Sequence, residues 1–355
     1  RTKFVPPGSN REYWEISRLW QKYDEIANYP LTVVKAGPGY GKSTTIAAYF
    51  RDRDDFFWYN VDEMDADPAV FLLNVFSAFQ WRNEEIAKEA LEALTDMSDN
   101  SGNFVRIVSS FINDLAKHLK VDTYLIIDDF HLVVQNKQII ELLTYFIKMM
   151  PAKMHLVLLT REKLSFREWA TWRLKRVVLI FDERDLMLTS EEIASFFGEQ
   201  YGIHISPEEA EKVYKESEGW MIALDLLGQG LTHGAQLHQV LDTETDSLDL
   251  LFEYLAYEVF ENQSAKVQEF LLKTAVLKNV RIDICNELLE ITDSEVMLEE
   301  MMDKGFFVFV LAPGQYRYHH LVREFLQKLG QDKYDYRELH RRASEICLRL
   351  EEKGL

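Results

Sequence analysis

A glycine-rich loop that carries a lysine and two hydroxyl side chains lies near the start of the chain. Residues 36–44 read Ala-Gly-Pro-Gly-Tyr-Gly-Lys-Ser-Thr and separate an expected strand, Leu31–Lys35, from an expected helix, Thr45–Phe50. Glycines let backbone N–H groups curl around phosphate oxygens, and the N-terminus of the following helix adds a positive field. We therefore expect a phosphate-binding loop. Its expected ligand contacts are Gly37, Pro38, Gly39, Tyr40, Gly41, Lys42, Ser43 and Thr44.

Each chemical role of such a loop has a candidate side chain. Lys42 is placed to reach the outer phosphates, and the Ser43 hydroxyl is placed to ligate Mg²⁺. One position departs from the usual GxxxxGK[ST] pattern, because Ala36 stands where the first glycine is expected and alanine restricts the backbone. The alternative is a glycine-rich turn that only caps a helix. The strand-loop-helix context favours the phosphate site.

Two adjacent carboxylates follow a buried apolar strand in the middle of the first half. The run Tyr124–Asp128 ends in an acid, and Asp129 follows it directly. A strand ending in this way is typical of the Walker B element, in which Asp128 would serve the magnesium ion. Asp129 would then orient or deprotonate water, if its environment differs from that of Asp128. Taken alone, the pair is also compatible with an ordinary loop start.

A fixed cation follows another apolar strand. Arg161 comes directly after His155–Thr160, where a guanidinium would sense the charge of a γ-phosphate. An ordinary solvated arginine is the alternative, and the sequence alone does not choose between the two.

The first half of the chain alternates short apolar runs with longer amphipathic stretches. This pattern predicts an α/β P-loop NTPase domain, in which a parallel sheet is flanked by helices, over residues 1–185. Chemistry should gather at the carboxyl ends of its strands. The five expected strands are Leu31–Lys35, Phe56–Val61, Tyr124–Asp128, His155–Thr160 and Val177–Phe181.

After Asp185 the pattern becomes helical. A hydroxyl cap before acids at Thr189–Glu192 predicts the start of a small helical domain over 186–245, with its end placed in a polar, glycine-bearing stretch. Residues 246–331 contain several helical patterns followed by a hairpin, Phe306–Leu311 and Gln315–Tyr318, which predicts a winged-helix domain. Residues 332–355 are expected to begin a truncated helical arm, so we treat the chain as a fragment.

The charge balance argues against a direct contact with nucleic acid or anionic membrane. The net charge is -19, and the helix expected at Asp293–Lys304 is strongly acidic, unlike a DNA recognition helix. The two cysteines have no metal-site or disulfide spacing, and no apolar run reaches the roughly 20 residues of a transmembrane helix. These features favour a reducing compartment, and we expect the cytoplasm.

Six ordered motifs resemble those of the signal-transduction ATPases with numerous domains (STAND). The resemblance is to the nucleotide-binding region of the large LuxR-type bacterial transcriptional regulators, like the maltose-regulon activator, and it spans nearly the whole chain. The motifs lie at residues 36–44, 58–68, 128–132, 159–161, 219–224 and 316–321.

The resemblance implies roles for several residues. Alanine is familiar in that family at the position of Ala36. Asp128 is implied to help hold Mg²⁺, Asp129 to be the second Walker B acid, and Arg161 to be a sensor of the γ-phosphate. Ile16 and Arg18 correspond to an adenine-side segment.

Two further positions lie in the second half. Met221 replaces the proline of a related glycine-x-proline turn, so a core role is expected there instead of an adenine contact. His319 aligns with a histidine that reaches the β-phosphate of ADP in related switches. A hydrogen-bonded core histidine is its alternative, and the adjacent His320 leaves the register open.

The resemblance implies a slow ATPase switch that binds ATP or ADP with Mg²⁺. In this hypothesis an ADP-bound closed state gives way to an ATP-bound state that self-associates. An inducer or signal protein and DNA would be bound only through regions beyond this chain. The alternatives are a P-loop kinase or phosphotransferase acting on a small acceptor, and a scaffold that binds nucleotide without turnover.

Overall fold

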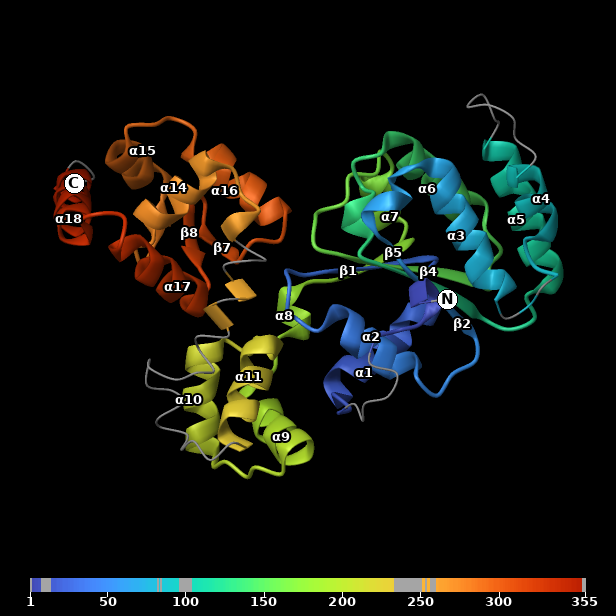
Figure 1. The fold of residues 1–355 in the computed structure, drawn as a ribbon, viewed down its shortest axis with the longest axis horizontal. Helices are drawn as coiled ribbons and strands as arrows, with labels where there is room; N and C mark the ends of the chain where they lie inside the picture. The colour runs from blue at the N-terminus through green and yellow to red at the C-terminus, as the bar shows by residue number, and fades with distance from the viewer. Residues whose placement is uncertain are drawn as a thin grey trace. The chain divides into compact units, whose positions relative to one another are not determined.

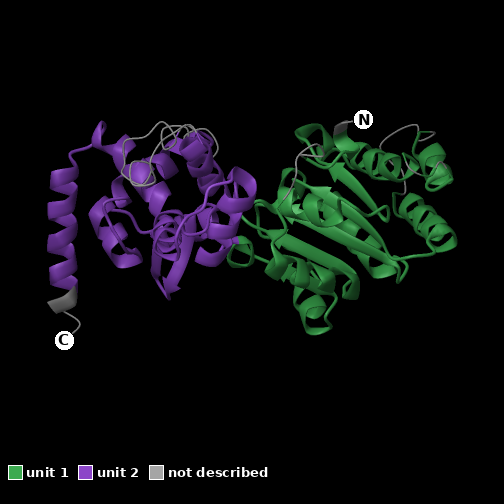
Figure 2. Ribbon diagram, turned by 90° about the horizontal axis from the view of Figure 1, so that it is seen from below, with its two compact units in different colours: residues 1–36, 41–186 green, residues 37–40, 187–355 purple. Residues whose placement is uncertain are grey.

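The computed structural model describes residues 2–7, 14–81, 83, 85–95, 104–232, 251–252, 254–255 and 260–352. It consists of two compact units, which Figure 2 shows in different colours. The first comprises residues 1–36 and 41–186, and the second comprises residues 37–40 and 187–355. The middle of the glycine-rich loop, residues 37–40, therefore groups with the second unit.

The first unit is built on a five-stranded parallel sheet with the order β2-β3-β4-β1-β5. Nearly every residue of its three central strands is buried, which explains why the strands are continuous apolar runs instead of alternating patterns. All five predicted strands are confirmed, each to within one residue at either end. They are β1 (Leu31–Lys35), β2 (Phe56–Asn60), β3 (Thr123–Asp128), β4 (Met154–Thr160) and β5 (Val178–Phe181).

Helices cover both faces of this sheet, as Figure 1 shows. Side-chain capping begins two of the longer ones: Asp67 accepts hydrogen bonds from the start of α3, and Asn136 does the same for α6. On one face lie α3 (Pro68–Gln80), α5 (Phe104–His118) and α6 (Lys137–Met149), and on the other lie α1 (Ser17–Tyr23) and α2 (Lys42–Phe50). The shorter helices are α4 (Lys88–Thr95), α7 (Trp169–Leu174) and α8 (Glu183–Leu186).

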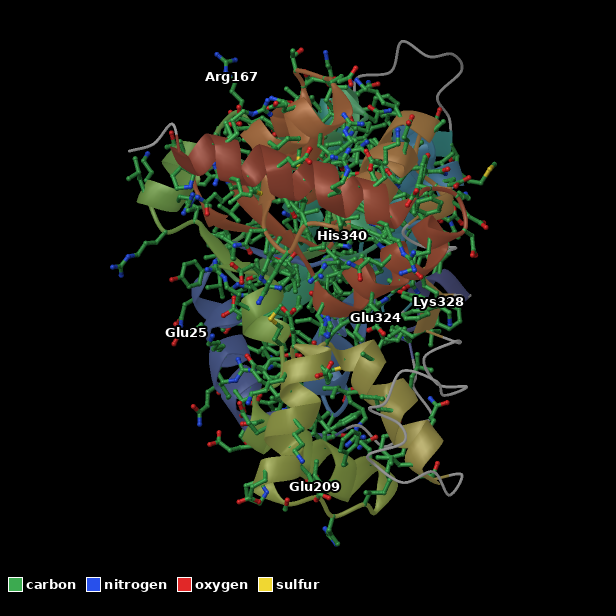
Figure 3. The ribbon with its side chains drawn as sticks, turned by 90° about the vertical axis from the view of Figure 1, so that its left-hand side faces the viewer. Glu25, Arg167, Glu209, Glu324, Lys328 and His340 are labelled. Atoms are coloured by element: carbon green, nitrogen blue, oxygen red, sulfur yellow. The ribbon has the colours of Figure 1, made fainter. Side chains whose placement is uncertain are left out.

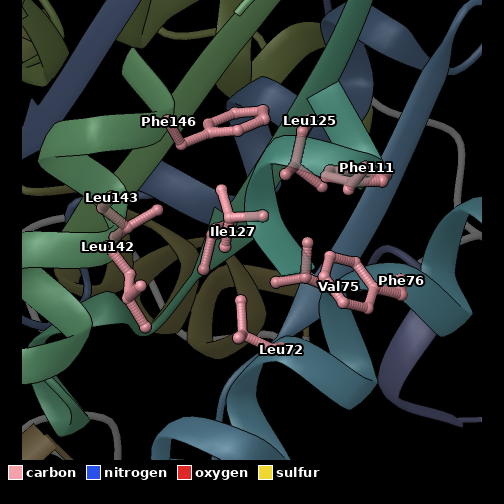
Figure 4. Close-up of a pocket in the computed structure, with 10 residues that line it drawn as sticks. Leu72, Val75, Phe76, Phe111, Leu125, Ile127, Leu142, Leu143 and Phe146 are labelled. Atoms are coloured by element: carbon pink, nitrogen blue, oxygen red, sulfur yellow. The ribbon is translucent and has the colours of Figure 1, made fainter. Parts of the chain in front are cut away.

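The core beneath α3, α5 and α6 contains a small apolar cavity of about 20 Å³ (Figure 4). Leu72, Phe111, Ile127 and Phe146 are among the residues that line it. A buried water needs two to four polar partners, which this aliphatic and aromatic lining does not offer. The cavity is therefore a packing feature of the core.

The second unit begins with three helices: α9 (Ser190–Tyr201), α10 (Pro207–Ser217) and α11 (Met221–Thr232). Capping boxes start the first two, since Thr189 pairs with Glu192 and Ser206 pairs with Glu209. Figure 3 marks Glu209 at the start of α10. The expected N-terminus at Thr189 is confirmed, whereas the expected domain end at 245 lies outside the described residues.

A winged-helix arrangement follows in the same unit. Its three-stranded antiparallel sheet has the order β6-β8-β7, formed by Val280–Arg281, Gln315–Tyr318 and Val308–Ala312. The hairpin begins two residues later than expected, because Phe306 and Phe307 still belong to the turn after the preceding helix. The helices are α14 (Ala265–Thr274), α15 (Ile282–Leu289), α16 (Ser294–Asp303) and α17 (His320–Gln331), followed by α18 (Tyr336–Glu352).

Charged and polar side chains lie on the outer faces of these helices. Lys328 of α17 and His340 of α18, for example, are marked in Figure 3. Over the described ranges, every helix falls short of the length and apolarity that crossing a bilayer would require.

Gly219 joins α10 to α11 at a position that excludes a side chain. Its φ is +72°, and an added Cβ would lie 2.3 Å from the carbonyl oxygen of Leu188. Gly202 has a similar φ of +68°, but its Cβ would meet nothing within 4 Å. The two glycines thus have the same backbone requirement and differ in available space.

We predict that Gly219→Ala lowers the free energy of unfolding more than Gly202→Ala does. The second variant should cost about 1 kcal/mol for left-handed backbone strain, whereas the first should cost at least about 3 kcal/mol, because backbone must also shift. Urea unfolding monitored by tryptophan fluorescence measures both. Equal losses would contradict the steric argument.

Candidate nucleotide-phosphate site

The carboxyl ends of the parallel strands bring several predicted site residues of the first unit to one edge of the sheet. Lys35 at the end of β1 pairs with Thr160 at the end of β4, and Asn60 pairs with Asp128 at the end of β3. The Ser43 hydroxyl, on the first turn of α2, donates to Oδ1 of Asp128 at 2.8 Å. Two motifs that lie 85 residues apart in the sequence are thus in direct contact.

The loop takes its shape from two glycines with left-handed backbone. The φ angle is +73° at Gly39 and +77° at Gly41, and Gly41 is the N-cap of α2. The helix consequently begins at Lys42, three residues before the expected start at Thr45. Ala36 has no positive φ and still donates its N–H to the Thr160 carbonyl at 3.2 Å. Alanine therefore costs no backbone strain at the position where the usual pattern has glycine.

Lys42 is buried at the start of α2. Its ammonium donates to the Ala36 carbonyl at 2.8 Å. Burial lowers the pKa of Lys42 to about 8, and the positive charge of Arg161 acts in the same direction, against the opposing effect of Asp128 and Asp129. The predicted sensor arginine therefore lies within electrostatic range of the predicted phosphate-binding lysine.

The two acids after β3 have different environments. Asp128 is buried, and burial together with the charge of Asp129 raises its pKa to about 6, although hydrogen bonds from Ser43 and the Asp129 N–H oppose that rise. The side chain of Asp129 is 44% exposed, and its backbone is left-handed, with φ +52°. Such strain in a residue other than glycine is common at functional sites. The geometry leaves Asp129 accessible to water and keeps Asp128 within the site.

His131 is a neighbour of the site to which the sequence analysis gave no role. Its Nδ1 lies 3.8 Å from Oδ1 of Asp129, across the short 3-10 turn Phe130–Leu132. Phe130 fills the core beneath that turn and holds it against the sheet. The only signal in the sequence is the two-residue spacing after the second acid.

Ser43 and Asp128 fit a magnesium ion in chemistry and spacing. Both offer hard oxygen ligands, and their 2.8 Å separation is close to the roughly 2.9 Å between neighbouring ligands of an octahedron with 2.0–2.1 Å bonds. Within the described ranges, no group of three or more His, Cys, Asp or Glu side chains is arranged to hold a metal. Magnesium is normally bound by few protein groups and completed by water and phosphate, so this pair suffices.

The segment before β1 is tied to the rest of the first unit by hydrogen bonds. Arg18 donates to the Asp185 carbonyl at 2.8 Å, and Tyr23 shares a 2.9 Å hydrogen bond with Thr45. Ile16 is buried at the N-cap of α1, while Thr44 is exposed. The nucleotide contacts expected of Ile16, Arg18 and Thr44 stay predictions.

The loop tip, Gly37–Tyr40, makes its contacts within the second unit. The indole N–H of Trp220 donates to the Pro38 carbonyl at 3.1 Å, and the N–H of Ile222 donates to the Gly39 carbonyl at 3.0 Å. The Tyr40 ring stacks on Phe307 at a centroid distance of 5.9 Å. The Gly219–Met221 segment, for which a core role was expected, therefore also contacts the loop directly.

His319 is completely buried in the same aromatic cluster. Its ring packs against Trp220 and Phe307, and its Nε2 lies 3.2 Å from the Ser217 carbonyl. A carbonyl accepts, so Nε2 carries the proton, and Nδ1 is an acceptor that meets no donor among the described residues. His320 is instead partly exposed and pairs with Glu216 at 3.0 Å.

Burial lowers the pKa of His319 to about 4, outweighing the opposing effect of Glu218, while His320 and Arg317 lower it further. Because the unfolded protein takes up this proton more readily than the native protein, protonation of His319 favours unfolding. The stability of the native state should therefore decrease as the pH falls from about 6.5 to 4.

The fold and the edge of the first sheet define a P-loop NTPase domain, followed by a helical region and a winged helix. Residues 256–338 match the family described as the MalT winged helix domain. A Walker-type ATPase of Pyrococcus abyssi has the same fold, with a TM-score of 0.63 at 14% identity over 91% of this chain and 98% of that one.

Relatives of known name are similar over almost the whole chain. The HTH-type transcriptional regulator MalT of Serratia proteamaculans is 28% identical over 94% of this chain and 37% of its own length. MalT of Vibrio campbellii is 24% identical over 98% of this chain and 39% of its own length. The predicted resemblance to MalT-like regulators is confirmed, and the chain spans less than two fifths of the length of these relatives.

Lys42 gives a test of the site that separates binding from stability. We predict that Lys42→Met abolishes ADP binding yet raises the stability of the nucleotide-free protein at pH 7 by about 3 kcal/mol, because burial lowers the pKa of Lys42 from 10.5 to about 8 and each pKa unit corresponds to about 1.4 kcal/mol. Between about pH 8 and 10.5, Lys42 binds fewer protons in the native state than in the unfolded state. The stability of the wild-type protein should therefore increase as the pH rises through this range. The variant should lack this gain.

Urea unfolding of the nucleotide-free protein at several pH values measures the effect. Lys215→Met, at a position whose side chain is 69% exposed, is the control and should change neither property. A loss of stability in Lys42→Met at pH 7 would contradict a costly buried charge.

Proposed function

We propose that this chain is the ATP- and ADP-binding switch module of a signal-responsive bacterial transcriptional regulator. The observation that carries the proposal is the 2.8 Å contact between Ser43 and Asp128, which unites the two phosphate-and-metal motifs next to a buried lysine. The similarity to regulators named MalT supports a role in transcription.

The geometry supports slow hydrolysis of ATP. A magnesium ion held by Ser43 and Asp128 would neutralise phosphate charge. Asp129, exposed and set apart by its left-handed backbone, is placed to orient or deprotonate the attacking water. Arg161 adds positive charge near Lys42, where charge on the γ-phosphate would develop.

The switch requires that ADP and ATP favour different states. His319 is the proposed contact to the β-phosphate in the ADP-bound state. To donate a hydrogen bond to phosphate, the ring must release the Ser217 carbonyl or gain a second proton on Nδ1. Either event changes the contacts of His319 inside the second unit. Phosphate binding at His319 would therefore be coupled to a conformational change.

The proposed partners follow from the charge and the relatives. With a net charge of -19, this module is not the part that binds DNA, and DNA contact is assigned to a separate effector region. The ATP-bound state is proposed to self-associate, and an inducer or signal protein to act through a further region. We propose a cytoplasmic location.

The nucleotide carried by the purified protein tests this function. We expect denaturation followed by chromatography to release ADP in a near one-to-one ratio. Asp129→Asn should instead retain ATP and show at least about a hundredfold slower turnover, because it loses the proposed base. A protein that arrives empty and binds neither ATP nor ADP with magnesium would overturn the proposal.

The two neighbouring histidines provide a matched pair for the phosphate contact. His319→Phe keeps an aromatic ring against Trp220 but removes both ring nitrogens, so ADP affinity should fall about tenfold or more, as for a hydrogen bond to a charged group. His320→Phe should leave ADP affinity unchanged. Titration calorimetry gives the affinities, and Tm should be recorded in parallel. Unchanged affinity in His319→Phe would remove this residue from the site.

A further inference from the structure

Two backbone carbonyls of the loop tip are held by one turn of the helical region. Trp220 donates its indole N–H to the Pro38 carbonyl, and Ile222 donates its backbone N–H to the Gly39 carbonyl, at 3.1 and 3.0 Å. Both donors belong to the 219–222 turn, the residues from Gly219 to Ile222 at the start of α11. The turn therefore fixes two consecutive peptide planes of a loop that is rich in glycine.

The direction of these carbonyls determines where the loop's N–H groups point. In a trans peptide the C=O and the N–H of the next residue lie on opposite sides of the chain. With the carbonyls of Pro38 and Gly39 directed at the turn, the N–H groups of Gly39 and Tyr40 are directed away from it. N–H groups presented in this way are the ones with which such loops bind phosphate oxygens.

The turn itself is rigidly held. Trp220 is fully buried, with Phe307 at 4.7 Å and His319 at 5.2 Å between ring centroids. The Gly219 carbonyl accepts a 3.0 Å hydrogen bond from the Leu188 N–H, and Gly219 has no room for a side chain. On the loop side, a Cβ added to Gly39 would lie 2.5 Å from the Ile222 side chain. The contact is close on both sides, so the loop tip has little freedom to turn its peptides.

We infer that Trp220 is a positioning residue for nucleotide phosphates, which orients the Gly39 N–H by holding the Pro38 carbonyl, next to the Tyr40 N–H that Ile222 orients through the Gly39 carbonyl. The inference rests on the proposed nucleotide binding. A glycine-rich loop without this restraint would lose conformational entropy when phosphate binds. Because the loop is already restrained in the nucleotide-free protein, less entropy is lost on binding. By thermodynamic reciprocity, bound phosphate in turn stabilises the 219–222 turn.

The test is Trp220→Phe, which keeps an aromatic ring and removes the indole N–H. After bound nucleotide has been removed, the affinities for ADP and AMP are measured by titration calorimetry. The loss of one restraining hydrogen bond should weaken ADP binding about five- to tenfold. AMP should be affected less, because it engages the loop through a single phosphate. The ratio of ADP to AMP affinity should therefore shrink.

Trp58→Phe is the matched control. Trp58 is also buried, and its indole N–H donates at 2.8 Å to Asn60 on its own strand, β2, within the first unit. This variant should lower Tm and leave both affinities unchanged. Should Trp220→Phe fail to fold, benzothienylalanine at position 220 removes the N–H while preserving the shape of indole.

The outcomes separate the two proposals. Wild-type protein that binds no nucleotide overturns the proposed function. Wild-type protein that binds ADP, together with position-220 variants of undiminished ADP affinity or an unchanged ADP to AMP ratio, overturns the inference alone. A shrunken ratio at position 220 with no change at Trp58 supports it.

Discussion

The pairing of β1 with both β4 and β5 is the constraint on which the site depends. It places the carboxyl end of β1 inside the sheet, so the loop that follows must emerge between the ends of other buried strands. The strand register places the carboxyl ends of β3 and β4 next to the start of the loop, and with them Asp128, Thr160 and Arg161. The apolar runs that look like simple core in the sequence thus determine the chemistry at their ends.

The site is costly to maintain without a ligand. Burial works against the charge of Lys42 and against the charge of Asp128, as the directions of their pKa shifts show. The proposed phosphate and its cation would supply opposite charges for both groups. These two buried charges lower the stability of the fold at the site, and the large apolar core beneath α3, α5 and α6 offsets that loss.

Much of the fold could be predicted because its signals are local. Five strands follow from continuous apolar runs, and the capping box at Thr189 follows from residue types three positions apart. The phosphate motif, too, is contiguous. What the sequence analysis missed depends on distant contacts: the role of Trp220 requires knowing that α11 meets the loop tip, and no periodicity encodes that meeting. His131 was missed because a histidine near an acid is unremarkable until the turn brings the two side chains together.

The hydrogen bond from Trp220 to Pro38 joins residues that are 182 positions apart. During synthesis, which proceeds from the N-terminus, the loop leaves the ribosome long before its restraining partner exists. The parallel sheet needs only residues up to Phe181, so its folding does not have to wait for α11. The loop tip, in contrast, can take its final shape only after residue 222 has been added. The order of translation therefore delays a fully shaped phosphate cradle until the helical region is present.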